Sequence, residues 1–98
     1  MAILKILDLS TDHITADDAM WLSNVELPIR VIKHDYGYFI NVVEESLTEM
    51  EERLVELEEF NFSKAFILLY RYAIHLNCSW INLDQDGELI DNLEQFSW

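Results

Sequence analysis

The chain has 98 residues, and its nineteen acidic residues against six basic ones give a formal charge of −13 at pH 7. Hydrophobic residues make up 51% of it, with only two glycines and one proline, which is typical of a single folded domain spanning residues 1–98 and excludes a disordered chain. Such a negative field repels nucleic acid and attracts basic protein surfaces, so direct binding to nucleic acid is disfavoured and the acids are expected on the outside.

The first quarter of the chain predicts a strand and then a short helix. Residues Ile3–Leu9 are apolar around Lys5 and Asp8, a pattern that suits a first strand. Thr15 and, three residues later, Asp18 form a capping box, which marks the start of a helix. We therefore expect a helix from Ala16 to about Asn24.

Two β-rich runs follow, Ile29–His34 and Tyr38–Val43. The short link between them, Asp35-Tyr36-Gly37, ends in glycine, which is typical of a hairpin turn. We therefore expect the two runs to pair as antiparallel strands.

The segment Glu44–Glu59 predicts an amphipathic helix with a very acidic polar side. It holds eight acidic residues among sixteen, and Ser46 with Glu49 forms a second capping box. An apolar stripe with spacings of three and four residues runs along it and is expected to face the core. The stripe consists of Leu47, Met50, Leu54 and Leu57.

The last third of the chain predicts a buried helix and one more strand. Asn61 interrupts the acidic helix, and Ser63 caps a third helix, Lys64–Asn77, which is apolar almost all round and is expected to be the central one. The pattern of Ser79–Leu83 predicts a strand, which is followed by a turn. A terminal hairpin, in which Glu88–Ile90 pairs with this strand, is an additional possibility. The C-terminal apolar residues are expected to dock on the core. They are Leu93, Phe96 and Trp98.

Together these elements predict an α+β fold in the order strand, helix, strand, strand, helix, helix, strand. Its architecture is a small antiparallel sheet with about three helices packed on one face. The longest apolar run, Ala65–Tyr70, is far shorter than the ~20 residues that a membrane-spanning helix needs, so we expect a cytoplasmic protein without a membrane partner. The one cysteine, Cys78, ends an apolar run and is expected to be a buried thiol.

Histidine provides two candidates for catalysis. His13 and Thr15 match one H-x-T pair of phosphoesterases that use two such pairs, but a second pair is absent and Thr15 already caps a helix. His75 and Cys78 are three residues apart, a spacing at which a base and a nucleophile meet on one helical face, but nothing positions a third group. We therefore expect a binding protein and not an enzyme.

Residues 82–87 resemble the first positions of a calcium-binding loop. The ninth and twelfth positions of that pattern should supply further ligands, and the twelfth should be glutamate, yet Ile90 and Leu93 stand there. Asp and Gly are also ordinary turn residues, so the sequence favours a turn, with no metal and no cofactor.

The acidic helix has two interpretations. The simpler one is a solvated helix face. The sharper one is mimicry of nucleic acid, because eight carboxylates along a helix of ~24 Å give one charge per ~3 Å, near the ~3.4 Å per phosphate of a single strand. Under mimicry the partner-binding residues lie on one flank, with a second flank that repeats every seven residues. The first flank comprises Glu45, Glu49, Glu52, Glu56 and Glu59, and the second includes Glu44 and Glu51.

Four segments give the chain a resemblance to a family of small, uncharacterised proteins of bacteria, plasmids and phages, a domain family of unknown function. The resemblance implies the fold and a mobile-element origin; residues 44–59 are not part of the shared pattern, and no catalytic residue follows from it. The four segments are Ser10-Thr11-Asp12-His13-Ile14-Thr15, Tyr36-Gly37-Tyr38-Phe39-Ile40, Cys78-Ser79-Trp80-Ile81 running into Asp84-Gln85-Asp86-Gly87, and Leu93-Glu94-Gln95-Phe96-Ser97-Trp98.

Two functional hypotheses follow. The leading one is a binding protein that blocks the basic site of a host defence complex or another nucleic-acid-handling complex, in an anti-CRISPR or antirestriction role, by presenting the acidic helix. The alternative is a structural or regulatory interaction module with an apolar partner surface, for which a homodimer is one form.

Overall fold

A computed structural model describes residues 5–23, 27, 29–42 and 47–96 of the chain. Within them it has an α+β fold whose order of helices and strands confirms the prediction. The helices are α1 (Ala16–Leu22), α2 (Leu47–Glu59) and α3 (Lys64–His75), with a single 3-10 turn, η1 (Thr11–His13), and the strands are β1 (Ile6–Ser10), β2 (Val31–His34), β3 (Gly37–Asn41) and β4 (Trp80–Asp84).

The four strands form one sheet in the order β1-β4-β3-β2. The predicted hairpin is present, since β2 pairs antiparallel with β3, and β3 pairs antiparallel with β4. The pair β1 and β4 is parallel, so the sheet is mixed where the sequence predicted a purely antiparallel one. The pattern of side chains in a segment predicts a strand, but it does not say whether that strand pairs parallel or antiparallel with its neighbour. The long chain between β1 and β4 permits the crossover connection that a parallel pair needs.

The option of a terminal hairpin was wrong for the described residues, because no strand follows β4 there. Strand β4 already has a neighbour on each side, so the next segment has no free edge to pair with. It crosses the end of β1 instead, where the Ser10 N–H donates to the Glu88 carbonyl at 2.8 Å. Gly87 permits this crossing, since a Cβ at that position would lie 2.3 Å from the Leu9 carbonyl oxygen.

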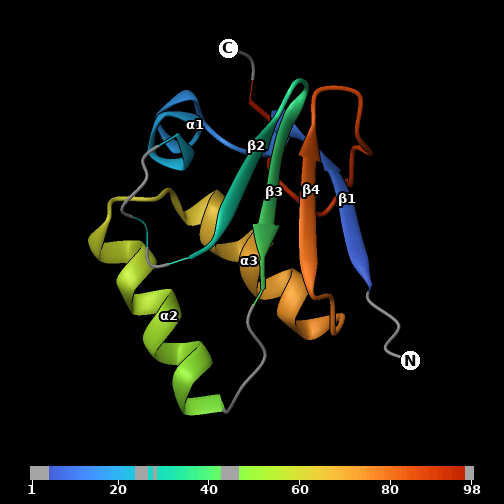
Figure 1. The fold of residues 1–98 in the computed structure, drawn as a ribbon. Helices are drawn as coiled ribbons and strands as arrows, with labels where there is room; N and C mark the ends of the chain where they lie inside the picture. The colour runs from blue at the N-terminus through green and yellow to red at the C-terminus, as the bar shows by residue number, and fades with distance from the viewer. Residues whose placement is uncertain (1–4, 24–26, 28, 43–46, 97–98) are drawn as a thin grey trace.

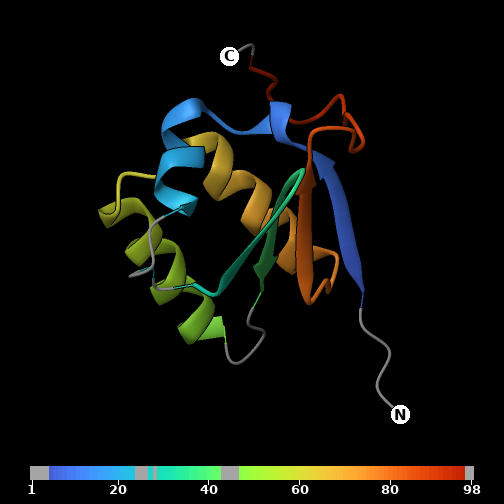
Figure 2. The same cartoon turned by 45° about the horizontal axis from the view of Figure 1, so that its top comes forward.

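All three helices lie on the same side of the sheet, as Figures 1 and 2 show. Helix α3 contacts both β4 and α2, which confirms its predicted central place. The opposite face of the sheet is covered by no described helix. The largest fully buried side chains of the described core, apart from His13 and Asp18, are Leu9, Ile14, Ile40, Leu57, Phe66, Leu69, Tyr70, Ile81 and Leu83.

A buried carboxylate joins the first turns of α1 and α3. The predicted capping box is present, since the Asp18 N–H donates to Thr15 Oγ1 at 3.0 Å and the Thr15 N–H donates to Asp18 Oδ2 at 3.1 Å. The same carboxylate accepts from Ser63, the predicted cap of α3, at 2.8 Å from the backbone N–H and at 2.5 Å from the hydroxyl. Asp18 is 0% exposed, and these donors compensate for its desolvation.

The helices α2 and α3 both end in a Schellman motif with asparagine in the left-handed conformation. Asn61 has φ 68° and Asn77 has φ 60°. The following amides, of Phe62 and Cys78, donate back to the carbonyls of Leu57 and Ala73. Asn61 therefore interrupts the acidic helix as predicted, and Cys78 is buried as predicted.

The C-terminal segment docks on the core through His13, which is 1% exposed. The Ile90 N–H donates to His13 Nε2 at 2.9 Å, so the ring proton is on Nδ1, which donates to the Glu94 carbonyl at 2.8 Å. The Phe96 N–H donates to the Asp12 carbonyl at 2.7 Å. The predicted docking is thus confirmed as far as Phe96, and Trp98 lies outside the described residues.

Candidate functional site

Helix α2 turns its predicted apolar stripe towards the core. Leu54 and Leu57 are 4% and 0% exposed, and Met50 is half-buried. This anchoring fixes the rotation of the helix about its axis, and so it decides which side chains point into solvent. The side chain of Leu47 and the capping residue Ser46 lie outside the described part of the structure.

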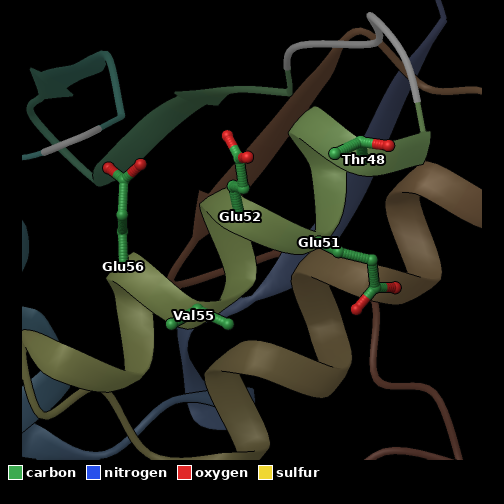
Figure 3. Close-up of a pocket in the computed structure, with 5 residues that line it drawn as sticks. All are labelled: Thr48, Glu51, Glu52, Val55 and Glu56. Atoms are coloured by element: carbon green, nitrogen blue, oxygen red, sulfur yellow. The ribbon is translucent and has the colours of Figure 1, made fainter.

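The outer side of α2 carries four of the predicted partner-binding acids. All are exposed: Glu49, Glu52, Glu56 and Glu59. At 100° per residue they fall within an arc of about 80° that faces away from Leu54 and Leu57. Figure 3 shows Glu52 and Glu56 pointing the same way from successive turns. The structure therefore brings these four residues together on one surface, which we call the acidic face.

Glu51 belongs to a different flank of the helix. In Figure 3 its side chain points away from Glu52 and Glu56, towards α3. It lies 3.6 Å from Arg71 of α3, with both side chains more than half exposed. A long, exposed ion pair of this kind contributes little to stability, and it partly neutralises the flank.

Within the acidic face, cations are few. Arg53 approaches Glu56 at 3.9 Å, a distance at which attraction in water is weak. For Glu52 and Glu59 no ion-pair partner exists among the residues that the structure describes. The face is therefore strongly negative where it meets solvent.

The acidic face borders a shallow, open depression of about 670 Å³. Its described lining comes from α2 alone, with Val55 (51% exposed) between the carboxylates. A surface that is open and flat does not enclose a small molecule, whereas a macromolecule with its own concave site can cover it. The lining residues are Thr48, Glu51, Glu52, Val55 and Glu56.

Two residues of the predicted set, Glu44 and Glu45, lie outside the described residues. The described helix has thirteen residues and a length of ~20 Å, against the sixteen residues expected from the sequence. The six acids from Glu49 to Glu59 are all within it and all exposed.

The candidates for catalysis take structural positions. His13 uses both ring nitrogens to hold the C-terminal segment, and Thr15 caps α1. Cys78 is buried, whereas His75 is exposed at the end of α3. These side chains are therefore not arranged as a nucleophile and base open to a substrate.

The acidic turn after β4 is closed by its own hydrogen bonds. The Gly87 N–H donates to the Asp84 carbonyl, and the Asp86 N–H donates to Asp84 Oδ1 at 2.8 Å, which makes an Asx turn. The side chain of Asn82 is bonded to His34 and Asp8 instead. The turn interpretation of this segment is confirmed.

Sequence reasoning missed one polar arrangement. On the face of the sheet without helices, Asn82 of β4 bridges His34 of β2 and Asp8 of β1. Alternation along each strand does place these residues on a single face, but only the order of the strands brings them together.

A protein-family model of unknown function, "Family of unknown function (DUF5983) C-terminal domain", matches residues 6–98. The chain belongs to this family. The match confirms the resemblance to a domain family of unknown function. No curated protein and no solved structure is significantly similar to the chain. In the described part, none of the helices is both long enough and apolar enough to cross a membrane.

Proposed function

We propose that this DUF5983 protein acts by binding, and that its acidic face occupies the basic site of a nucleic-acid-handling protein or complex. The observation that carries the proposal is the position of Glu49, Glu52, Glu56 and Glu59 on the exposed side of a helix whose other side is buried. A rigid helix holds these charges in a fixed pattern, so a partner can recognise their arrangement as well as their sum.

The spacing of the charges supports mimicry of nucleic acid. From Glu49 to Glu59 the helix rises by ~15 Å, and six carboxylates share that length, so there is one per ~3 Å of axis. A single nucleic-acid strand carries one phosphate per ~3.4 Å. A groove lined with Lys and Arg that neutralises phosphates at this density can therefore accept the carboxylates of α2.

The rest of the molecule strengthens the attraction. With a charge of −13 the whole protein steers towards a basic surface, and the rate of association should fall as salt is added. Val55, which is exposed beside the acidic face, adds an apolar contact that salt does not weaken.

The partner we propose is a cytoplasmic complex of the host. The resemblance to proteins of phages and plasmids favours a defence system that must hold nucleic acid to work, so that occupation of its channel stops it. This is an anti-CRISPR or antirestriction role, and the protein would compete with nucleic acid without binding it.

The test is affinity capture from bacterial lysate at low and high salt, followed by mass spectrometry. Wild-type bait is compared with a triple variant in which Glu49, Glu52 and Glu56 are changed to Lys. The matched control changes three exposed acids away from α2, and so has the same net charge as the triple variant. It combines Asp35→Lys, Glu88→Lys and Asp91→Lys.

We expect wild type and control to retain a nucleic-acid-binding complex that salt releases, and the α2 variant to lose it. Single-stranded or duplex DNA added in excess should displace the protein from that complex. Equal capture by all three baits, or equal loss from both variants, would make the acidic face a solvated surface and contradict the proposal.

A further inference from the structure

Helices α2 and α3 lie side by side and form a groove between them, which we call the α2–α3 groove. The short link 60–63 joins the helices, and Glu51 near the start of α2 lies 3.6 Å from Arg71 near the end of α3, so the two run in opposite directions. The groove holds a depression of about 270 Å³. The described lining of this depression consists of Met50, Glu51 and Leu54 from α2 and of Arg71, Ile74 and His75 from α3.

The lining of the groove combines an apolar floor with charged rims. Leu54 is 4% exposed, and Met50 and Ile74 are half-buried, whereas Glu51 and Arg71 are exposed. A third helix fits between two neighbouring helices when its apolar stripe faces such a floor and its flanks stay in solvent. The arrangement therefore matches an amphipathic helix.

The two walls of the groove continue towards the link and repeat one pattern. On α2 an exposed valine has a glutamate four residues before it and another three residues after it, and on α3 an exposed leucine has a cation at each of these spacings. Residues at such spacings share one side of a helix. The α2 wall is therefore negative and the α3 wall positive, with Val55 (51% exposed) and Leu68 (58% exposed) in the middle of each. The wall residues are Glu51, Val55 and Glu58 on α2 and Lys64, Leu68 and Arg71 on α3.

We propose that the α2–α3 groove binds an amphipathic helix of a partner protein, whose apolar stripe lies between a basic flank and an acidic flank. The charges of the two walls select this occupant, because the basic flank lies along the glutamates of α2 while the acidic flank lies along the cations of α3. Nucleic acid, or a helix with charges of one sign, meets a wall of like charge on one side. Val55 and Leu68 contact the apolar stripe from its two sides.

The ion pair between Glu51 and Arg71 does not hold the groove closed. At 3.6 Å, with both side chains more than half exposed, the pair contributes little to stability. A docked helix offers each of these two side chains a partner of opposite charge in exchange. The groove can therefore accept the helix without a large loss of its own interactions.

The length of the walls sets the size of the contact. From Glu51 to Glu58 the α2 helix rises by ~11 Å, which corresponds to about two turns of a docked helix. Such a contact is smaller than a standard protein interface. We therefore expect an isolated helix to bind with a Kd of about 100 μM.

The test uses synthetic helical peptides as probes and the full chain, isotope-labelled for NMR, as the target. The first probe has about 14 residues, with Leu in a stripe of helical period, Lys along one flank and Glu along the other. A control peptide keeps these charges and has Gln in place of every Leu. The first probe should shift amide signals of α2 and α3 with a Kd of about 100 μM, and the control peptide should bind at least about tenfold more weakly.

A substitution on α3 locates the binding site. Leu68→Gln should raise the Kd of the first probe at least about fivefold, because it removes an apolar contact and leaves the charge of the chain unchanged. The matched control is Met20→Gln, since Met20 is 63% exposed on a separate helix, α1, and it should leave the Kd unchanged. Circular dichroism of both variants establishes that they are folded.

A mirror probe, in which Lys and Glu exchange flanks, tests the charged walls themselves. Reversing the direction of a helix in a groove exchanges its two flanks, so each probe has one direction that matches both walls. A nitroxide spin label on the amino end of the first probe should broaden amide signals at one end of the groove, and the same label on the mirror probe should broaden those at the other end. The two ends are marked by Met50 with His75 and by Glu58 with Lys64.

Three results would overturn the proposal. One is the absence of any saturable shift in α2 and α3 up to about 2 mM of the first probe. Another is an equal effect of Leu68→Gln and Met20→Gln, which would show that the probe contacts apolar side chains without preference. The third is the same direction for both probes, which would show that the walls do not select charge. None of these measurements changes a residue of the acidic face, so the two proposals fail separately.

Discussion

Carboxylates play opposite parts in two regions of this molecule. On the acidic face of α2 the side chains of Glu49, Glu52, Glu56 and Glu59 are exposed to solvent, and Glu56 forms a long ion pair with Arg53. At the junction of α1 and α3, Asp18 is fully buried and accepts hydrogen bonds from the first turns of both helices. The difference teaches that burial and donors, and not the count of acids, decide which carboxylates the fold depends on.

The largest effect should come from the junction. Asp18→Ala removes the acceptor of the Thr15 N–H and of both Ser63 donors, and it leaves these groups buried. We expect it to lower the free energy of unfolding by about 3–4 kcal/mol, since it combines the loss of a helix cap with unsatisfied buried donors. Urea unfolding measures this.

The neighbouring acid, Asp17, provides the control for that measurement. It is exposed in the same first turn of α1, so Asp17→Ala should cost under about 1 kcal/mol. Equal losses from the two variants would mean that charge at the helix start, and not the buried bonds of Asp18, stabilises the junction.

A smaller effect should follow from His13→Ala, at the last residue of η1. The variant loses the bonds to Ile90 and Glu94 and leaves a cavity, so we expect a loss of about 2–3 kcal/mol. Hydrogen exchange at the Ile90 amide should accelerate more than exchange at the amides of β3. His75→Ala, at an exposed position, should leave both unchanged. An unaltered stability with a lost activity would instead return His13 to the role of a catalytic residue.

The smallest effect on stability should come from the acidic face itself. Changing Glu49, Glu52 and Glu56 together to Gln should alter the free energy of unfolding by less than about 1 kcal/mol, because these are surface positions and like charges three and four residues apart repel each other. Added salt should stabilise the wild type more than the variant, because it screens the repulsion between the carboxylates. Thermal unfolding at two ionic strengths measures this difference. A loss of more than about 2 kcal/mol would show that the fold needs these acids, and the comparison with Asp18 would fail.

Local patterns predicted most of the helices and strands. The structure confirms the predicted caps of two helices, Thr15 and Ser63. It also confirms that the acidic helix is interrupted at Asn61. The apolar stripe of α2 was also readable, because Leu54 and Leu57 follow the helical period. All of these signals lie within a few residues of each other, where backbone geometry alone connects them.

Contacts between distant residues were not predictable in this way. That Asp18 bonds Ser63, that β1 runs parallel to β4 and that His34 reaches Asn82 all depend on how separate elements meet. A single sequence holds no signal for such pairings. For the same reason, the sequence did not predict that the segment after β4 crosses the end of β1 at Gly87. The acidic face could be predicted because one helix carries it, whereas the bonding of Asn82 to His34 and Asp8 could not because three strands build it.

The parallel pair of β1 and β4 also has a consequence for synthesis of the chain. Ile6 pairs with Trp80, and the side chains of Asp8 and Asn82 bond across 74 residues. Strand β1 is synthesised before β4 and therefore has no pairing partner until β4 has been synthesised. The hairpin of β2 and β3 likewise cannot join the rest of the sheet before β4 pairs with β3. Non-local pairing of this kind slows folding, and this domain should complete its sheet only after nearly all of it has left the ribosome.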